Sequence, residues 1–77
     1  MATRVWASKI EFKENTNGKP MAYVTVEMQA WDGQAPIIVG VPASNDRDVI
    51  LEEVRKRLII LFQSAAEDVA TGPLTLR

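Results

Sequence analysis

The side chains with the greatest chemical capacity in this sequence are four carboxylates close together in the second half of the chain. They are Asp46, Asp48, Glu52 and Glu53. Paired carboxylates can act as general acid and base or hold a magnesium ion. Carboxylates at a helix start, however, also cap the helix and interact favourably with the positive end of its dipole. Because no further group joins the four at a convincing spacing, we expect helix capping there, and neither catalysis nor metal binding.

For the other common catalytic mechanisms, the chain lacks a residue that the mechanism requires. The chain has no His and no Cys, which excludes imidazole acid–base catalysis, thiol nucleophiles, disulfides and the usual zinc ligands. Ser8, Ser44 and Ser64 have no evident activating base, and the glycines do not follow a phosphate-binding spacing. The sequence therefore predicts a protein that is not an enzyme and holds no cofactor.

Length and composition predict one small domain, residues 1–77. The hydrophobic share of 47% and the charged share of 25% are typical of a folded globular protein. Nine Lys and Arg against ten Asp and Glu give a net charge of -1, so no overall field attracts a polyanion or an acidic membrane. A domain of this size buries only about 60 to 65% of the surface that its unfolded chain exposes, so self-association is an expected supplement.

The N-terminal residues bear on location. Met1 to Phe12 alternates polar and apolar residues and contains Lys9 and Glu11, a pattern that fits neither a secretory leader nor a membrane span. Together with the absence of cysteine, this predicts a cytoplasmic protein with no membrane partner.

Alternation of polar and apolar residues predicts three strands. They span about 4–13, 21–31 and 36–42. Asn17-Gly18 is a strong turn signal between the first two strands, and Pro36 is expected at the start of the third. Residues 37–41 are apolar at nearly every position, which is typical of a strand covered on both faces.

A 3.6-residue period of apolar side chains predicts one long helix, at about 46–70. Ser44 or Asn45 is expected to cap its start, and a left-handed Gly72 to end it. Residues 72–77 form a tail that leaves open a short extra strand. The predicted architecture is α+β with the order β-β-β-α, a two-layer sandwich of an antiparallel meander sheet and one helix. At about 1.5 Å per residue the helix spans roughly 37 Å and should extend beyond the sheet.

The apolar side chains exceed what one core can cover, and they predict an interaction surface. Period-two alternation puts Trp6, Ile10 and Phe12 beneath the helix. The candidate surface residues are Val5, Tyr23, Trp31 and Ile38 on the opposite sheet face, and Lys56 and Ile60 on the back of the helix. We predict a protein-interaction module that acts as a homodimer or binds another protein. The competing interpretations are scattered surface apolar residues and a solvated helix face with ion pairs four residues apart.

The alternative function is binding of single-stranded nucleic acid on the sheet face. Lys9 and Lys13 could follow phosphates while Tyr23 and Trp31 stack on bases. Glu11 lies among these residues and would oppose a polyanion, so nucleic acid is the less expected partner. The order of strands and helix resembles that of transcriptional-coactivator proteins that bind single-stranded DNA. Their basic motif has no match in this chain, so no residue role follows from the likeness.

Overall fold

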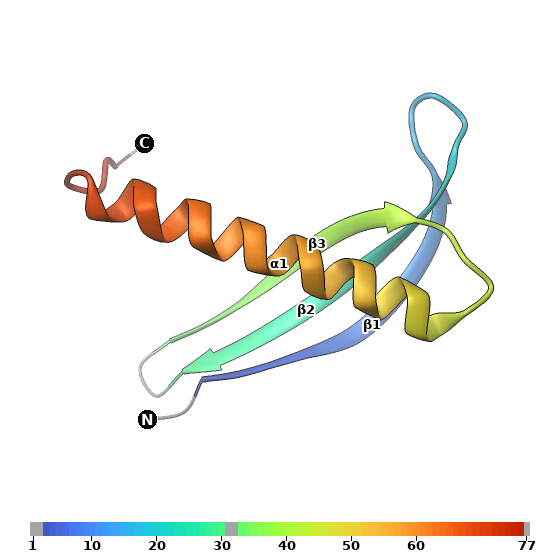
Figure 1. The fold of residues 1–77 in the computed structure, drawn as a ribbon, viewed down its shortest axis with the longest axis horizontal. Coiled ribbons are helices and arrows are strands. Elements are labelled where there is room, and N and C mark those ends of the chain that lie inside the picture. The colour runs from blue at the N-terminus through green and yellow to red at the C-terminus, as the bar shows by residue number, and fades with distance from the viewer. Residues whose placement is uncertain (1–2, 31–32, 77) are drawn as a thin grey trace.

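The computed structural model describes residues 3–30 and 33–76 of the chain. It contains one three-stranded sheet and one helix, with the bounds β1 Arg4–Glu14, β2 Pro20–Ala30, β3 Gly33–Pro42 and α1 Arg47–Ala70. The strands are antiparallel in the order β1-β2-β3, and α1 crosses one face of the sheet (Figure 1). The predicted β-β-β-α fold of the α+β class is thus confirmed.

The turn between β1 and β2 is built by Asn15 and Gly18. The Asn15 Oδ1 accepts hydrogen bonds from the backbone N–H groups of Asn17 and Lys19, each at 2.9 Å. Gly18 has a φ of 78°, a conformation that residues with a Cβ seldom adopt. The turn predicted at Asn17-Gly18 therefore forms, and it fixes the register in which β1 and β2 pair.

β3 is an edge strand that begins three residues earlier than predicted. Pro36 consequently lies within the strand rather than at its start. An edge strand tolerates proline because its outward backbone N–H groups have no neighbouring strand to bond. The prediction that residues 37–41 are covered on both faces is wrong for the single chain, since Ile38 is 69% exposed.

A β-bulge interrupts β1 near its middle. The register against β2 shifts between Ala7 and Lys9, which leaves Ser8 as an extra residue. The Ser8 hydroxyl lies within donating distance of the Thr25 carbonyl oxygen, at 3.4 Å, and of Glu27 Oε1, at 3.3 Å. Because side chains alternate between the two faces of a sheet, one extra residue reverses the faces of the residues on one side of it.

The bulge reverses the predicted faces of the first residues of β1. Val5 lies opposite Met28, on the side of the sheet that carries α1, whereas Trp6 lies opposite Glu27 on the outer side. The prediction that Val5 is on the outer face and Trp6 beneath the helix is therefore wrong. Beyond the bulge, Ile10 lies on the helix side, as predicted.

The start of α1 is capped by Asp46 rather than by Ser44 or Asn45. The Asp46 side chain accepts a hydrogen bond from the backbone N–H of Asp48 at 2.9 Å. Ser44 supports this cap, because its hydroxyl oxygen accepts from the Asp46 N–H at 3.1 Å.

The end of α1 also differs from the prediction. Thr71 is the C-cap residue and keeps a right-handed backbone conformation. Its hydroxyl donates to the Asp68 carbonyl oxygen at 2.7 Å, so the last turn is closed without the predicted left-handed Gly72. Residues 73–76 follow as an irregular tail.

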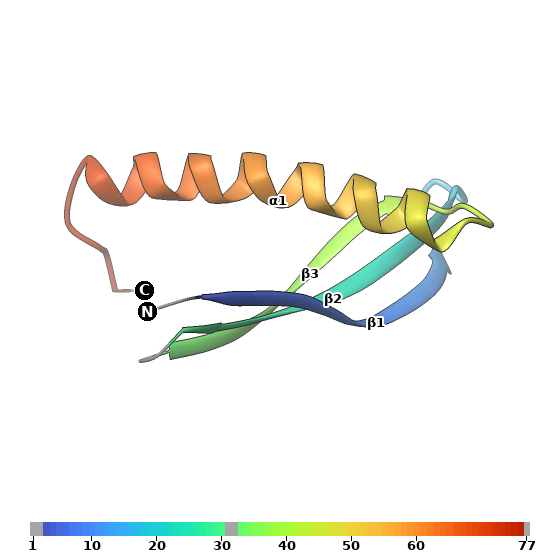
Figure 2. The same ribbon diagram turned by 60° about the horizontal axis from the view of Figure 1, so that its bottom comes forward.

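The core lies between α1 and the strands β2 and β3. Its buried side chains are Ala22, Val24, Val26, Val39, Val41, Ile50, Val54 and Leu58. Figure 2 shows that the helix and the sheet diverge toward the C-terminal end of α1. The apolar face of the helix is consequently buried only in its first half: Val54 is 3% exposed, but Val69 is 55% exposed.

Candidate interaction surfaces

Much of the strand β1 is left uncovered on the side of the sheet that carries α1. The helix packs mainly on β3 and β2, and only its first turns pass over β1 (Figures 1 and 2). Phe12 is 60% exposed although its register partner in β2, Ala22, is buried. Val5 is exposed in the same way near the other end of β1. Side chains that would belong to a core in a larger protein are therefore open to solvent here.

This uncovered strip and the adjacent flank of α1 form an apolar groove of about 370 Å³, which we call the β1–α1 groove. It is lined by Val5, Trp6, Ala7, Val26, Leu51, Val54, Arg55, Leu58, Ile59 and Phe62. Trp6 borders the groove although its register places it on the outer side of the sheet, because β1 is an edge strand. The charged residue among them, Arg55, has its Nη1 3.1 Å from Glu52 Oε1. A more polar hollow of about 620 Å³ continues the groove toward the start of α1 and shares Ala7 and Leu51 with it.

The outer face of the sheet brings together three of the predicted nucleic-acid contacts. Lys9, Lys13 and Tyr23 line one hollow of about 390 Å³, together with Glu11 and Ile38. The fourth candidate, Trp31, lies outside the residues that the structure describes.

Glu11 pairs with both lysines of the outer face. The Lys13 Nζ lies 3.0 Å from Glu11 Oε2, and the Lys9 Nζ lies 3.3 Å from Glu11 Oε1. Hydrogen bonds and charge attraction, from Lys13 first and then from Lys9, lower the pKa of Glu11 below its ordinary value. Each lysine is thus engaged with a carboxylate on the surface where a phosphate would have to bind.

Tyr23 is held against the backbone of the neighbouring strand. It lies opposite Gly40 of β3, and a Cβ on Gly40 would stand 3.0 Å from Tyr23 Cε1. Glycine at this position therefore permits the close approach of the ring, which leaves Tyr23 half-buried.

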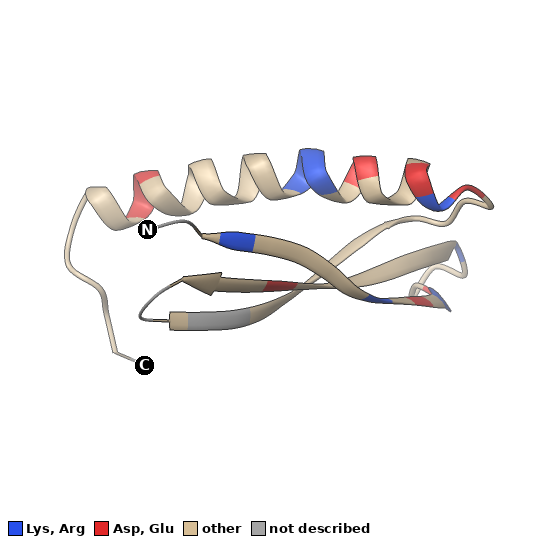
Figure 3. Ribbon diagram, turned by 90° about the horizontal axis from the view of Figure 1, so that it is seen from below, with Lys and Arg blue, Asp and Glu red and all other residues tan. Residues whose placement is uncertain are grey.

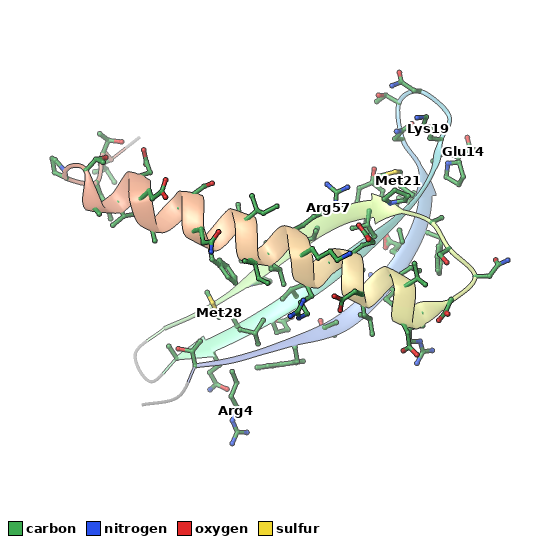
Figure 4. The ribbon with its side chains drawn as sticks, viewed as in Figure 1. Arg4, Glu14, Lys19, Met21, Met28 and Arg57 are labelled. Carbon is green, nitrogen blue, oxygen red and sulfur yellow. The ribbon has the colours of Figure 1, made fainter. Side chains whose placement is uncertain are left out.

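The structure joins two candidate surfaces that the sequence treated as separate. Ile38 of β3 and Ile60 of α1 line the same hollow of about 490 Å³, with Arg57, Leu61 and Ser64 also in its lining. Ile60 is 64% exposed, and Arg57 extends from the helix on the β3 side (Figure 4). The outer sheet face and the back of the helix thus meet at the edge of β3.

Lys56, the other candidate on the helix back, pairs with Glu53. Its Nζ lies 3.6 Å from Glu53 Oε1. This pair and the Arg55–Glu52 pair join residues three apart, rather than four apart as the competing interpretation of a solvated helix face had it. Both are exposed, and exposed pairs of this kind contribute little to stability.

Three of the four acidic residues around the start of α1 have structural partners. Asp46 caps the helix, and Glu52 and Glu53 pair with basic residues of the next turn. Within residues 3–30 and 33–76, no three His, Cys, Asp or Glu side chains gather as metal ligands would. In the same ranges, no helix combines the length and hydropathy that crossing a membrane requires.

The chain matches no known family. Comparisons with models of protein families, with curated proteins and with solved structures find no match. The candidate surfaces are therefore argued from the geometry of this chain alone.

The β1–α1 groove is the feature that the sequence did not predict. Strict alternation assigned Val5 to the outer face, so the apolar strip along β1 was divided between two faces. Val5 and Ala7 fall on the same face as Ile10 and Phe12 only if one residue between Ala7 and Ile10 is left out of the alternation. The spacing of these apolar residues is the one signal in the sequence that points to the bulge.

Proposed function

We propose that this chain is a small protein-interaction module that acts as a homodimer and has no catalytic activity of its own. The apolar surface that a single chain leaves open is the observation that carries the proposal. Among the described residues, eight hydrophobic side chains are buried, while eleven large hydrophobic side chains are exposed. Apolar surface of this extent on a small domain is typical of a protein that contacts another. The proposal includes a cytoplasmic location, since a chain without cysteine makes no use of an oxidising compartment.

The two edges of the sheet are poor surfaces for this contact. The bulge at Ser8 in β1 and Pro36 in β3 each interrupt the row of backbone groups that another strand would pair with. Both are devices that proteins use against edge-to-edge pairing. We therefore favour contact through a face of the domain over extension of the sheet.

Sedimentation equilibrium of the purified chain tests the homodimer. We expect the apparent mass to rise toward twice the chain mass between about 1 and 200 μM, because association follows mass action. The Ile60→Asp variant in the same experiment tests the hollow that Ile60 shares with Ile38. A wild-type chain that stays monomeric over the whole range refutes the homodimer.

Binding of single-stranded nucleic acid is the second candidate. It is favoured by the shared position of Lys9, Lys13 and Tyr23 around one hollow, and opposed by Glu11 between the two lysines. Fluorescence of Trp31 in a Trp6→Phe variant, titrated with a single-stranded oligonucleotide at low and high salt, tests it. Binding through phosphates must weaken as salt rises, and a flat titration at low salt removes this candidate.

A further inference from the structure

We propose that the β1–α1 groove binds the C-terminal half of α1 from a second copy of this chain, with the two helices antiparallel. This inference rests on the proposed homodimer and assigns its surface. The groove requires an apolar occupant, because its walls are Val5 and Ala7 on the strand and Leu58 and Phe62 on the helix. The hollow beside β3 fits an apolar occupant less well, because Arg57 and Ser64 are part of its lining.

The length of the groove matches a segment that the chain itself leaves uncovered. Along α1 the groove runs from Leu51 to Phe62, about 16 Å at about 1.5 Å per residue. The next residues of α1, 63–70, are all exposed and span about 12 Å on the same scale. In Figures 1 and 2 this part of the helix extends past the sheet. One copy therefore supplies an exposed helical segment of the length that the groove of the other copy accepts.

The exposed segment carries an apolar stripe on the flank that faces the groove. Arg55, Ile59 and Phe62 line the groove, and Ala66 and Val69 continue their spacing of four and three residues. This spacing keeps side chains on one flank of a helix and is typical of helices that pack against each other. Beyond Arg55 the stripe is apolar. Its first part, Ile59 and Phe62, lines the groove of its own chain, and its second part, Ala66 and Val69, can fill the groove of the other copy.

A twofold axis beside residues 61 and 62 seats each exposed segment in the groove of the other copy. An antiparallel pair about this axis sets Leu58 opposite the partner's Ala65, a large side chain facing a small one. Phe62 meets the same region of the partner at the axis. The arrangement is isologous, so one set of contacts forms twice and both grooves are filled.

The charges of α1 favour the same alignment independently. Figure 3 shows basic residues in the middle of the helix and acidic residues near its C-terminal end. They are Arg55, Lys56 and Arg57, and Glu67 and Asp68. An axis beside residues 61 and 62 sets each basic group level, along the helix axis, with the partner's acidic pair at the rim of the contact, whereas parallel helices in register would bring like charges together. The match of charges thus favours this register, and the match of lengths is compatible with it.

Two variants that add the same charge on opposite flanks of α1 test the surface. Ala66 and Ser64 are both exposed and both lie beyond the last buried residue of the helix. Ala66→Lys places an ammonium group in the proposed contact, level with the partner's Arg57 and next to the groove that Arg55 lines, and we expect the dimer dissociation constant to rise about 100-fold or more, since an unpaired buried charge is strongly unfavourable. Ser64→Lys lies in the lining of the hollow beside β3, and we expect it to change the constant by less than about threefold. Circular dichroism of both variants checks that the helix is retained.

A charge exchange tests the antiparallel register. Lys56→Glu should weaken the dimer several-fold, and Lys56→Glu with Glu67→Lys should restore it to within about twofold, as paired surface charges do in double-mutant cycles. A double variant that is as weak as Lys56→Glu alone overturns the register.

The outcomes separate this inference from the proposed homodimer. A wild-type chain that does not dimerise removes both. A wild-type dimer that tolerates Ala66→Lys, or that Ser64→Lys weakens as strongly, refutes binding in the groove and leaves the homodimer in place. Loss of the dimer in Ala66→Lys but not in Ser64→Lys supports binding in the groove.

Discussion

The same substitution at two positions of the apolar face of α1 should have very different costs. Val54 lies against the sheet and is 3% exposed, whereas Val69 lies beyond the sheet and is 55% exposed. Val54→Ala removes two buried carbons, worth about 0.8 kcal/mol each, and leaves a cavity that adds to the loss. Alanine returns about 0.5 kcal/mol through its higher helix propensity. The expected net loss of unfolding free energy at position 54 is therefore about 1.5 to 2 kcal/mol.

Val69→Ala should be close to neutral in the monomer. About half of the side chain is already in water, so the transfer loss is about 0.7 kcal/mol, and the gain in helix propensity offsets most of it. Urea unfolding followed by far-ultraviolet circular dichroism at about 2 μM measures both variants where the monomer dominates. Equal losses at the two positions would refute the conclusion that the sheet covers only the first half of the helix.

Protein concentration adds a second readout to this pair of variants. If the exposed segment of α1 is buried in a second copy, the cost of Val69→Ala must grow with concentration, because binding stabilises only the folded dimer. The cost of Val54→Ala should stay nearly constant, since the chain's own sheet buries Val54 at any concentration.

Three other predictions follow from local contacts. Gly40→Ala should be less stable than Gly33→Ala in thermal unfolding, because a Cβ at position 40 meets Tyr23 Cε1 at 3.0 Å while one at position 33 meets nothing within 4 Å; equal melting temperatures would contradict the Tyr23 contact. Asp46→Ala should cost about 1 kcal/mol in urea unfolding through loss of the helix cap, and Asp46→Asn should recover most of it. Because Lys13 and Lys9 lower the pKa of Glu11 in the folded state, Glu11 contributes stability that is complete above its unfolded pKa and is lost as pH falls through the lower folded pKa. Glu11→Gln should remove this part of the acid dependence of the urea midpoint, and high salt should weaken it in the wild type; an unchanged profile in the variant would count against the ion pairs.

The sequence predicted the elements of this fold because their signals are local. Asn17-Gly18 specifies the first turn through the positive φ of Gly18, and the 3.6-residue period specifies α1. The helix cap at Asp46 was missed because Ser44, Asn45 and Asp46 are all good cap residues. The choice among them depends on the backbone leaving β3, which composition does not encode.

The candidate surfaces were predicted less well because they depend on pairing across the sheet. The faces of Val5 and Trp6 are set by the bulge at Ser8, and a bulge is defined only against the partner strand. The exposure of β1 depends on the diagonal path of α1 over β3 and β2, which follows from tertiary packing. Ile38 and Ile60, by contrast, are exposed on the surfaces to which simple periodicity assigned them.

The extra residue at Ser8 affects the edge of the sheet more than the faces of β1. Removing the Ser8 codon would restore strict alternation while Val5 and Ala7 stay on the helix side, Trp6 stays on the outer side, and every residue from Lys9 onward keeps its face. Such a deletion would leave the side chains that face α1 in place and remove the contacts of the Ser8 hydroxyl with Thr25 and Glu27. The loss of one codon would thus turn β1 into a regular, uninterrupted edge that another chain could extend, the route by which small domains form fibres.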